Sequence, residues 1–286
     1  MPIDPAVALG AELPAQEFSW SSSDIQLYNL GLGAGSRPTD AGELRYLGDH
    51  APQALPTFAT VAATFHQIEP PKVSFPGIEI DLAKVVHGSQ EVLVHAPIPP
   101  SGKGRTVTRI SEVWDKGKAA VIVQESTTED PDGNPLWTAR SSIFARGEGG
   151  FGGERGPSES VELPEREPDA EIDVPTLPQQ ALLYRLCGDR NPLHSDPEFA
   201  AAAGFPAPIL HGLCTYGIVC KAVTDRLLDA DAARVAGFRA RFAGVVFPGE
   251  TLRIRVWDEG SRKLATASVV ERDFAPALAD VVLTVS

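Results

Sequence analysis

Polar and apolar residues alternate along several segments of the chain, which is the pattern of strands with one buried face. In the first half, this period of two covers residues 92–94, 107–113, 120–124 and 136–144. Glycine, proline, aspartate and serine gather between them, so we expect turns at residues 101–104, 115–118 and 130–135. The pattern predicts an antiparallel sheet.

Other segments have helical character. In the longest, residues 212–228, apolar residues recur every three or four positions, and Lys221, Asp225 and Arg226 are expected on the outer side. Shorter helices are predicted over residues 24–30, 59–67 and 179–186, and a short strand at residues 17–20. The strands of the second half are expected at residues 237–246, 250–259, 261–272 and 280–285.

Residues 146–173 separate the two halves. They contain six glycines, several prolines and many charged residues, which is linker composition. We therefore expect an N-terminal repeat at residues 1–145 and a C-terminal repeat at residues 174–286. The halves also share short sequence motifs. Tyr28-x-Leu30 recurs as Tyr184-x-Leu186, and residues 85–90 can be aligned with residues 245–250. The sequence predicts a duplicated α+β fold.

The segment richest in candidate chemistry is Asp-Arg-Asn-Pro-Leu-His at residues 189–194. Pro192 has no N–H and disfavours a helical conformation at the residue before it, so we expect a loop or turn. A carboxylate and an imidazole on one tight loop can share a water and handle protons at neutral pH. The alternative is that Asp189 and Asn191 only cap turns and that His194 only satisfies a hydrogen bond in the core.

This loop is part of a longer ordered motif, which also includes Tyr184, Gly188, the small residues 200–203, Ile-Leu-His-Gly at residues 209–212, and residues 242–252. The motif resembles that of the R-specific enoyl-CoA hydratases, the hydratase 2 or MaoC-like enzymes of the hot-dog superfamily. The resemblance extends to the first half through residues 28–31 and 55–58. It implies a double hot-dog fold, in which each of two repeats is a long helix wrapped by an antiparallel β-sheet.

The resemblance also implies a lyase (hydro-lyase) that hydrates trans-2-enoyl-CoA reversibly to (3R)-3-hydroxyacyl-CoA in fatty acid metabolism. Such an enzyme needs no metal, and no cofactor besides the CoA of its substrate. Two alternatives stay open. One is a (3R)-3-hydroxyacyl thioester dehydratase of chain elongation, which runs the same step backwards. The other is a non-catalytic subunit that binds acyl thioesters, because a fold does not fix an activity.

Hydration requires an activated water, a proton for C2 and stabilisation of the enolate charge. We expect Asp189 and His194 to hold the water and move its proton, with either as the base, and Asn191 to orient the water or the carboxylate. The resemblance gives Gly212 the oxyanion role, and the unpaired N–H groups of helix N-termini suit that role. His211 is expected to line the site and bind substrate, or to make a structural hydrogen bond.

The first repeat lacks these groups. An alignment on the shared tyrosines places Gly33, Gly35 and Pro38 where the second repeat has its aspartate, asparagine and histidine. Leu47 stands where two-repeat members of the family often have an acidic residue. None of these side chains can carry a proton, so we expect a non-catalytic first repeat. It would accommodate the acyl chain, as the resemblance implies, or only stabilise its partner.

Arg239 and Arg241 share one face of a predicted strand. Contact with CoA phosphates is one interpretation, but a solvated strand face is the commoner meaning, and we leave both arginines out of the site.

Composition narrows the class of protein. The net charge of −13 argues against a nucleic-acid surface. Cys187, Cys214 and Cys220 follow no metal-ligand spacing and are expected to be buried free thiols. The sequence shows no signal peptide pattern, no apolar run of membrane-spanning length and no peroxisomal address. We therefore expect a cytoplasmic homodimer that acts on acyl-CoA thioesters, without nucleic-acid or membrane partners.

Overall fold

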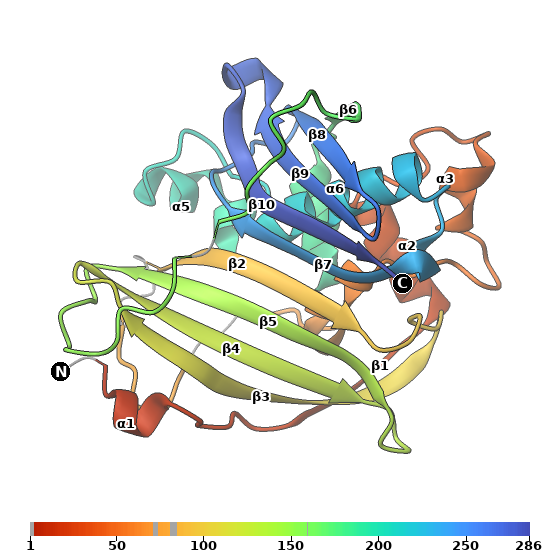
Figure 1. Ribbon diagram of the computed structural model, residues 1–286. Helices are drawn as coiled ribbons and strands as arrows, with labels where there is room; N and C mark the ends of the chain where they lie inside the picture. Colours follow the sequence, from red (N-terminus) through yellow and green to blue (C-terminus); the bar gives the residue numbers. More distant parts are fainter. Residues whose placement is uncertain (1–2, 71–73, 81–84, 159) are drawn as a thin grey trace.

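The computed structural model describes residues 3–70, 74–80, 85–158 and 160–286. Within them, ten strands form one antiparallel sheet (Figure 1). The first half contributes β1 (Gln16–Trp20), β2 (Val85–Val94), β3 (Gly102–Asp115), β4 (Ala119–Glu129) and β5 (Pro135–Arg146). The second contributes β6 (Ala170–Pro175), β7 (Val235–Phe242), β8 (Thr251–Glu259), β9 (Arg262–Val269) and β10 (Ala275–Val285). The strands predicted from alternation are therefore confirmed, most of them with longer bounds.

The order of strands across the sheet shows that the chain is a duplication. The order is β1-β3-β4-β5-β2-β7-β10-β9-β8-β6. From the outer edge of the sheet to its centre, each half places its strands in the same sequence, namely its first, third, fourth, fifth and second strand. The halves meet where β2 pairs with β7, from Ser89 opposite Arg241 to Leu93 opposite Gly237. This arrangement confirms the duplicated α+β fold. The alignment of residues 85–90 with 245–250 was wrong, because β2 corresponds to β7 whereas residues 245–250 precede β8.

The predicted central helix of the second repeat is α6 (Gly212–Leu227), which lies behind β7 and β10 in Figure 1. Val219, Cys220 and Val223 are buried, as their spacing predicts. Lys221 was expected on the outer side but is only 6% exposed. Its ammonium group lies between two carboxylates, 3.0 Å from Glu43 and 2.7 Å from Asp225, and these ion pairs make its burial possible.

The described residues of the first repeat do not contain the long helix that the resemblance implies. Residues predicted as a helix over 59–67 form two short 3₁₀ helices instead, η1 (Pro56–Thr60) and η2 (Ala62–Thr64). This segment is rich in β-branched side chains, which disfavour α-helix. The hydroxyls of Thr60 and Thr64 also donate to backbone carbonyls three residues earlier, which competes with the regular helical ladder.

Short helices complete the fold. The predicted helix after β1 is confirmed as α2 (Ser22–Gly31), which begins with a capping box between Ser21 and Asp24. The predicted short helix of the second half is confirmed as α4 (Gln180–Tyr184). The remaining ones are α1 (Pro5–Ala8), α3 (Ala41–Arg45), η4 (Arg185–Cys187), η5 (Pro192–His194), α5 (Pro197–Ala202), η6 (Ala232–Arg234) and η7 (Val270–Arg272).

The segment between β5 and β6 is shorter than the predicted linker 146–173, because β6 begins at Ala170 and pairs with β8. Its described residues contact both repeats. The Lys116 ammonium group donates to the carbonyl of Pro157, and the Val161 N–H donates to the Asp280 carboxylate. Trp257 donates its indole N–H to the carbonyl of Arg166. The described residues of this segment are therefore hydrogen-bonded to both repeats at several points.

Two of the three turns predicted in the first half are confirmed, at residues 116–118 and 130–134. The third was wrong, because Gly102 and Gly104 lie inside β3 and pair with β1. A Cβ at either position would run into the ring of Trp20 or Phe18. The glycines here allow close packing of aromatic rings rather than a turn.

The main core lies between the sheet and the helices and includes residues of both repeats. A second core, centred on Ile3, Phe75, Ile110 and Ile122, lies where the N-terminal segment packs on the first half of the sheet. All three cysteines are buried and free, as expected. No helix among the described residues is both long and apolar enough to cross a membrane.

Candidate active site

The loop that carries the candidate catalytic residues begins at Gly188, which ends η4 with a φ of +105°. Glycine is required here, because a Cβ would also collide with the carbonyl group of Thr64 in η2. The next residues stabilise the turn locally. The Asp189 carboxylate accepts the Asn191 N–H at 3.1 Å, and the Asn191 side chain accepts the Leu193 N–H at 3.0 Å. Both side chains therefore cap the turn, as the alternative interpretation of the sequence predicts.

His194 ends η5 and is 8% exposed. Its Nδ1 lies 2.9 Å from the carbonyl oxygen of Ile209. Because a carbonyl only accepts, Nδ1 carries the proton, and the neutral ring keeps its lone pair at Nε2. The core hydrogen bond expected from the sequence therefore exists, and it leaves the other ring nitrogen available for chemistry.

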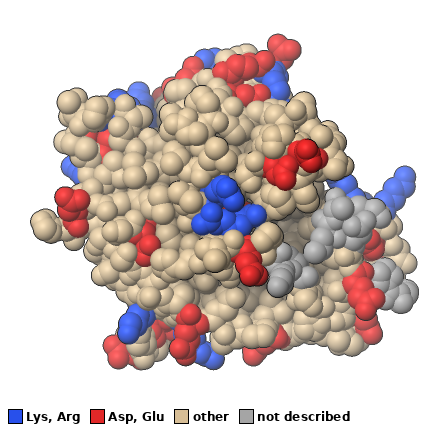
Figure 2. Space-filling model, turned by 180° about the vertical axis from the view of Figure 1, so that it is seen from behind, with Lys and Arg blue, Asp and Glu red and all other residues tan. Residues whose placement is uncertain are grey.

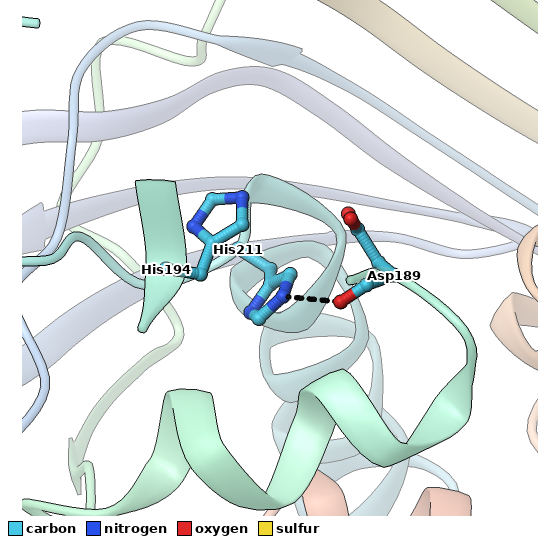
Figure 3. Close-up of side chains that lie close together, drawn as sticks. All are labelled: Asp189, His194 and His211. Atoms are coloured by element: carbon cyan, nitrogen blue, oxygen red, sulfur yellow. Dashed lines mark hydrogen bonds between the residues drawn. The ribbon is translucent and has the colours of Figure 1, made fainter. Parts of the chain in front are cut away.

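His211 packs directly against His194. The two imidazoles are stacked, with ring centroids 3.7 Å apart and planes inclined by 27°. The Nε2 of His211 lies 3.3 Å from the backbone carbonyl oxygen of Asp189, the bond drawn dashed in Figure 3. One side-chain atom each of Asp189, His194 and His211 lie within 4.8 Å of one another. The fold therefore brings together three of the five candidate residues from two separate segments.

Gly212 is the first residue of α6, and His211 is its N-cap. The Gly212 N–H lies outside the ladder of hydrogen bonds within the helix, as at every helix N-terminus. A Cβ at Gly212 would lie 3.0 Å from the ring of Phe242 at the end of β7. The absence of a side chain thus brings the start of α6 close to β7 and leaves its N–H groups next to the two histidines.

Burial sets the protonation of this cluster. It lowers the pKa of His194 below the ordinary value for histidine, although the neighbouring Asp189 carboxylate opposes the shift. Burial, together with the nearby His194, lowers the pKa of His211 to about 2. Both imidazoles are therefore neutral at neutral pH, and the Nε2 of His194 is a proton acceptor.

A carboxylate and two imidazoles also form a possible ligand set for a divalent metal. Imidazoles bind metals along lone pairs that lie in the ring plane. The two rings here are stacked, so their lone pairs point alongside one another instead of toward a common centre. The Nδ1 of His194 and the Nε2 of His211 are already hydrogen-bonded to carbonyl groups. This geometry suits proton transfer better than metal binding.

Cys187 and the two arginines of β7 lie near the site but take no part in it. Cys187 is buried next to the loop, and burial raises the pKa of its thiol to about 12, which makes it a poor nucleophile. Arg241 forms an ion pair with Asp280, and Phe242, the next residue, faces Gly212. Because side chains alternate along a strand, Arg241 and Arg239 lie on the other face of the sheet. Their omission from the site agrees with this position.

No chemical role was expected for Tyr184 beyond its place in the motif. Its ring centroid lies 5.0 Å from that of His211, and its hydroxyl is buried.

In the first repeat, Gly33 and Gly35 have positive φ values and form the turn after α2, and the Gly35 N–H donates to Glu43. Glu43 in turn pairs with the buried Lys221, so this carboxylate has a structural role.

Comparisons with known proteins identify the family of the chain. Residues 18–147 match the family described as "MFE-2 hydratase 2 N-terminal domain", and residues 159–275 match "MaoC like domain". The enoyl-CoA hydratase ChsH3 of Mycobacterium tuberculosis is 65% identical over 283 residues, which cover 99% of both chains. The 3-hydroxyacyl-thioester dehydratase Y of the same organism is 41% identical over 97% of this chain and 95% of that protein.

Solved structures lead to the same conclusion. A MaoC-like dehydratase from Phytophthora capsici superposes with a TM-score of 0.89 at 30% identity, over 99% of this chain and 98% of that one. A Mycobacterium tuberculosis protein described as having a double hotdog fold superposes with a TM-score of 0.58 at 13% identity, over 98% of this chain and 96% of that one, which supports the fold alone. The chain therefore belongs to the MaoC-like hydratase 2 family, with the double hot-dog fold.

Proposed function

We propose that this protein is an R-specific enoyl-CoA hydratase, which adds water reversibly to trans-2-enoyl-CoA and forms (3R)-3-hydroxyacyl-CoA. The observation that carries the proposal is the convergence of Asp189, His194 and His211 beside the N-terminus of α6. The similarity to proteins named enoyl-CoA hydratase supports the reaction class.

In the proposed mechanism, His194 is the base. Its Nδ1–H is fixed on the carbonyl of Ile209, so the free Nε2 takes a proton from water as the water oxygen bonds to C3. The Asp189 carboxylate holds the water and stabilises the transient imidazolium. The proton taken by His194 then returns to C2, so one water is added in total. Asn191 holds the Asp189 carboxylate through its backbone N–H.

The electrons of the alkene move onto the thioester oxygen during attack at C3. The N–H of Gly212, supported by the dipole of α6, is the proposed donor to that oxygen. One such donor contributes about 3 kcal/mol of transition-state stabilisation in comparable acyl chemistry. We propose that the reaction uses no resident cofactor or metal, since water and substrate supply every atom of the product and the Gly212 N–H takes the place of a Lewis acid at the thioester oxygen.

The CoA part of the substrate is anionic, whereas the chain has a net charge of −13. A local basic surface would offset this unfavourable field. Lys and Arg side chains do gather at one place near the middle of the face shown in Figure 2, which is otherwise mostly uncharged. We assign the CoA phosphates to a basic surface of this kind rather than to Arg239 and Arg241.

The first repeat is proposed to be non-catalytic. A pocket of about 140 Å³ lies beside the start of η1 and the β2–β7 junction, in the position that the two-fold order of the sheet relates to the active site. Gln53, the one polar residue of its lining, has its side chain hydrogen-bonded to backbone groups of residues 230 and 232. The short η1 and η2 helices occupy less space than α6, which supports accommodation of the acyl chain in this half.

A second candidate is the reverse reaction, dehydration of a (3R)-3-hydroxyacyl thioester during chain elongation. The similarity to a protein named 3-hydroxyacyl-thioester dehydratase favours it. Both directions use the same groups, so the carrier and the supply of substrate decide between them. A non-catalytic thioester-binding role fits less well, because it would not need a neutral histidine with a free ring nitrogen beside a carboxylate.

We also propose that the protein is a cytoplasmic homodimer. Three buried free thiols suit a reducing compartment. Light scattering of the eluted protein is expected to give twice the chain mass of 30.4 kDa. A monomeric mass would contradict the dimer without affecting the proposed chemistry.

The reaction is tested by mixing the purified protein with crotonyl-CoA and with longer enoyl-CoA esters, and by following the enoyl absorbance. Hydration lowers the absorbance without releasing CoA thiol. Release of thiol would indicate a thioesterase, and an unchanged absorbance with tight binding would indicate a binding subunit. The same series of acyl chains on an acyl carrier protein shows which carrier the enzyme uses.

A further inference from the structure

Three buried polar atoms next to the catalytic pair have no hydrogen-bond partner among the described residues. They are the hydroxyl oxygen of Tyr184, the Nδ1 of His211 and the Nε of Arg185. Tyr184 is 0% exposed and His211 is 1% exposed. Their rings are neighbours, with centroids 5.0 Å apart and planes inclined by 52°. Unpaired polar atoms are costly in a protein interior, so two on adjacent rings need an explanation.

The Tyr184 hydroxyl and the His211 Nδ1 have opposite hydrogen-bonding character. His211 faces the backbone carbonyl of Asp189 through Nε2, and a carbonyl only accepts, so Nε2 carries the proton and Nδ1 has a lone pair. Burial raises the pKa of Tyr184 well above its ordinary value, so its hydroxyl remains protonated and can donate. A buried donor and a buried acceptor therefore belong to two neighbouring rings.

We propose that Tyr184 is a positioning residue, whose hydroxyl donates to the Nδ1 of His211 through one buried water. This bond selects the tautomer of His211 that holds a proton on Nε2, and that proton anchors the backbone of Asp189. It also fixes the plane of the ring on which His194 is stacked. Tyr184 thus acts on the reaction through His211, and the inference rests on the proposed roles of Asp189 and His194.

The first repeat provides a matched control. Tyr28 lies on α2 as Tyr184 lies on α4 and is 0% exposed, and the Thr57 side chain is a hydrogen-bonding neighbour of its hydroxyl. The two tyrosine rings are neighbours, with centroids 6.1 Å apart. The ring neighbour of Tyr28 on the first repeat is Phe58, where Tyr184 has His211. Replacing either tyrosine with phenylalanine removes one equally buried hydroxyl, but only Tyr184 has an imidazole beside it.

The test compares Tyr184→Phe with Tyr28→Phe in hydration of crotonyl-CoA and in ¹⁵N NMR spectra of histidine-labelled protein. Tyr184→Phe is expected to lower kcat about tenfold with little change in KM, because the loss concerns geometry and not substrate binding. It should also convert His211 to a mixture of tautomers. Tyr28→Phe should keep kcat within about twofold and leave the His211 signals unchanged.

The pH profile gives an independent readout. The groups that face His211 are His194, Asp189, Tyr184 and Arg185, and of these only Tyr184 is proposed to donate to Nδ1. A donor to the lone pair favours the neutral ring, so its loss raises the pKa of His211. The pH at which the ¹⁵N signals of His211 report its protonation is therefore expected to rise in Tyr184→Phe and to stay in place in Tyr28→Phe.

Equal kinetics in the two variants, with the His211 tautomer unchanged, would overturn the proposal. If Tyr184→Phe fails to fold, the wild-type spectrum still decides, because a proton on the Nδ1 of His211 contradicts the proposed bond. The proposed function is tested separately by Asp189→Asn. Full hydration activity in that variant would reject the catalytic pair while leaving the tautomer result intact.

Discussion

Lys221 of α6 and Glu43 of α3 form a buried ion pair that joins the two repeats, with 3.0 Å between ammonium nitrogen and carboxylate oxygen. Asp225 completes the cluster, since it accepts from Lys221 and from the hydroxyl of Tyr46. Replacing Lys221 with methionine leaves a buried carboxylate without its main partner. We expect the free energy of unfolding to fall by about 3 kcal/mol in urea titrations.

A surface ion pair is the control for this prediction. Arg255 pairs with Glu171 across β8 and β6, and both side chains are largely exposed. Arg255→Met should leave the free energy of unfolding unchanged within error, because water screens such pairs. If the two variants are equally stable, Lys221 contributes no more than an exposed lysine does.

Asp189→Asn and His194→Ala are each expected to lower kcat by about 10²- to 10⁴-fold, the usual loss on removing an acid–base group. Both variants should fold normally, as judged by circular dichroism and thermal unfolding. Asp196→Asn is the matched control, because Asp196 is a nearby aspartate that caps α5, and asparagine caps helices equally well. Normal turnover in either catalytic variant would eliminate the proposed mechanism.

Activity should depend on pH through the neutral form of His194. Burial holds the pKa of His194 below the ordinary value of about 6.5, so the base form persists into mildly acidic solution. We expect kcat/KM to be constant between about pH 6.5 and 8 and to fall only at lower pH. A profile that already falls as the pH drops from 8 to 7 would show that another group is the base.

Stability should depend on pH in the same direction. Folding lowers the pKa of His211 to about 2, whereas an unfolded histidine titrates at about 6.5. Between these values the unfolded chain binds a proton that the folded chain does not. The free energy of unfolding should therefore fall as the pH drops below about 6.5. In His211→Asn this slope should be smaller by about 1.4 kcal/mol per pH unit, and an unchanged slope would contradict the burial of a neutral ring.

Acyl-chain accommodation in the first repeat can be tested at Ala62 in η2. Ala62 is 1% exposed, so tryptophan at this position would disrupt the core, and valine is the better probe. If the acyl chain runs past η2, Ala62→Val should lower turnover of long-chain enoyl-CoA more than that of crotonyl-CoA. Ala6→Val, at an exposed position of α1 outside the pocket beside η1, should affect neither substrate. An equal loss for both substrates in Ala62→Val leaves the first repeat with a structural role only.

The stereochemistry of the product provides a further prediction. Coupling the reaction to an S-specific 3-hydroxyacyl-CoA dehydrogenase should give no signal, because the proposed product is the (3R) isomer. An R-specific dehydrogenase serves as the positive control under identical conditions. A full signal with the S-specific enzyme would assign water to the opposite face of the alkene.

Much of the fold could be predicted from the sequence, because half-buried strands and an amphipathic helix repeat their pattern over many residues. The wrong predictions concern residues whose conformation or burial is determined by tertiary contacts. Lys221 looks like a surface lysine until Glu43, 178 positions away in the sequence, is placed beside it. Gly102 and Gly104 look like turn residues, and only the rings of the paired strand β1 explain them. Local propensity did contain the missing signal for η1 and η2, in their β-branched residues.

Only part of the candidate site could be predicted from the sequence. Asp189 and His194 share one short loop, so their proximity could be foreseen. His211 lies seventeen positions beyond His194, and its stacking on His194 depends on how α6 begins against β7. No sequence pattern reports which ring nitrogen carries a proton, because that depends on the carbonyl groups of Ile209 and Asp189.

The central position of β2 and β7 has a consequence for any attempt to divide the chain. Cutting between β5 and β6 would leave each half with a long strand, β2 or β7, as a bare edge that was paired before. Exposed edges of this kind attract other strands, so each half alone is expected to self-associate or aggregate. Produced together, the halves can cover each other's edges. Each repeat thus protects the edge strand of the other from aggregation. Because the two repeats are fused in one chain, this protection is always present.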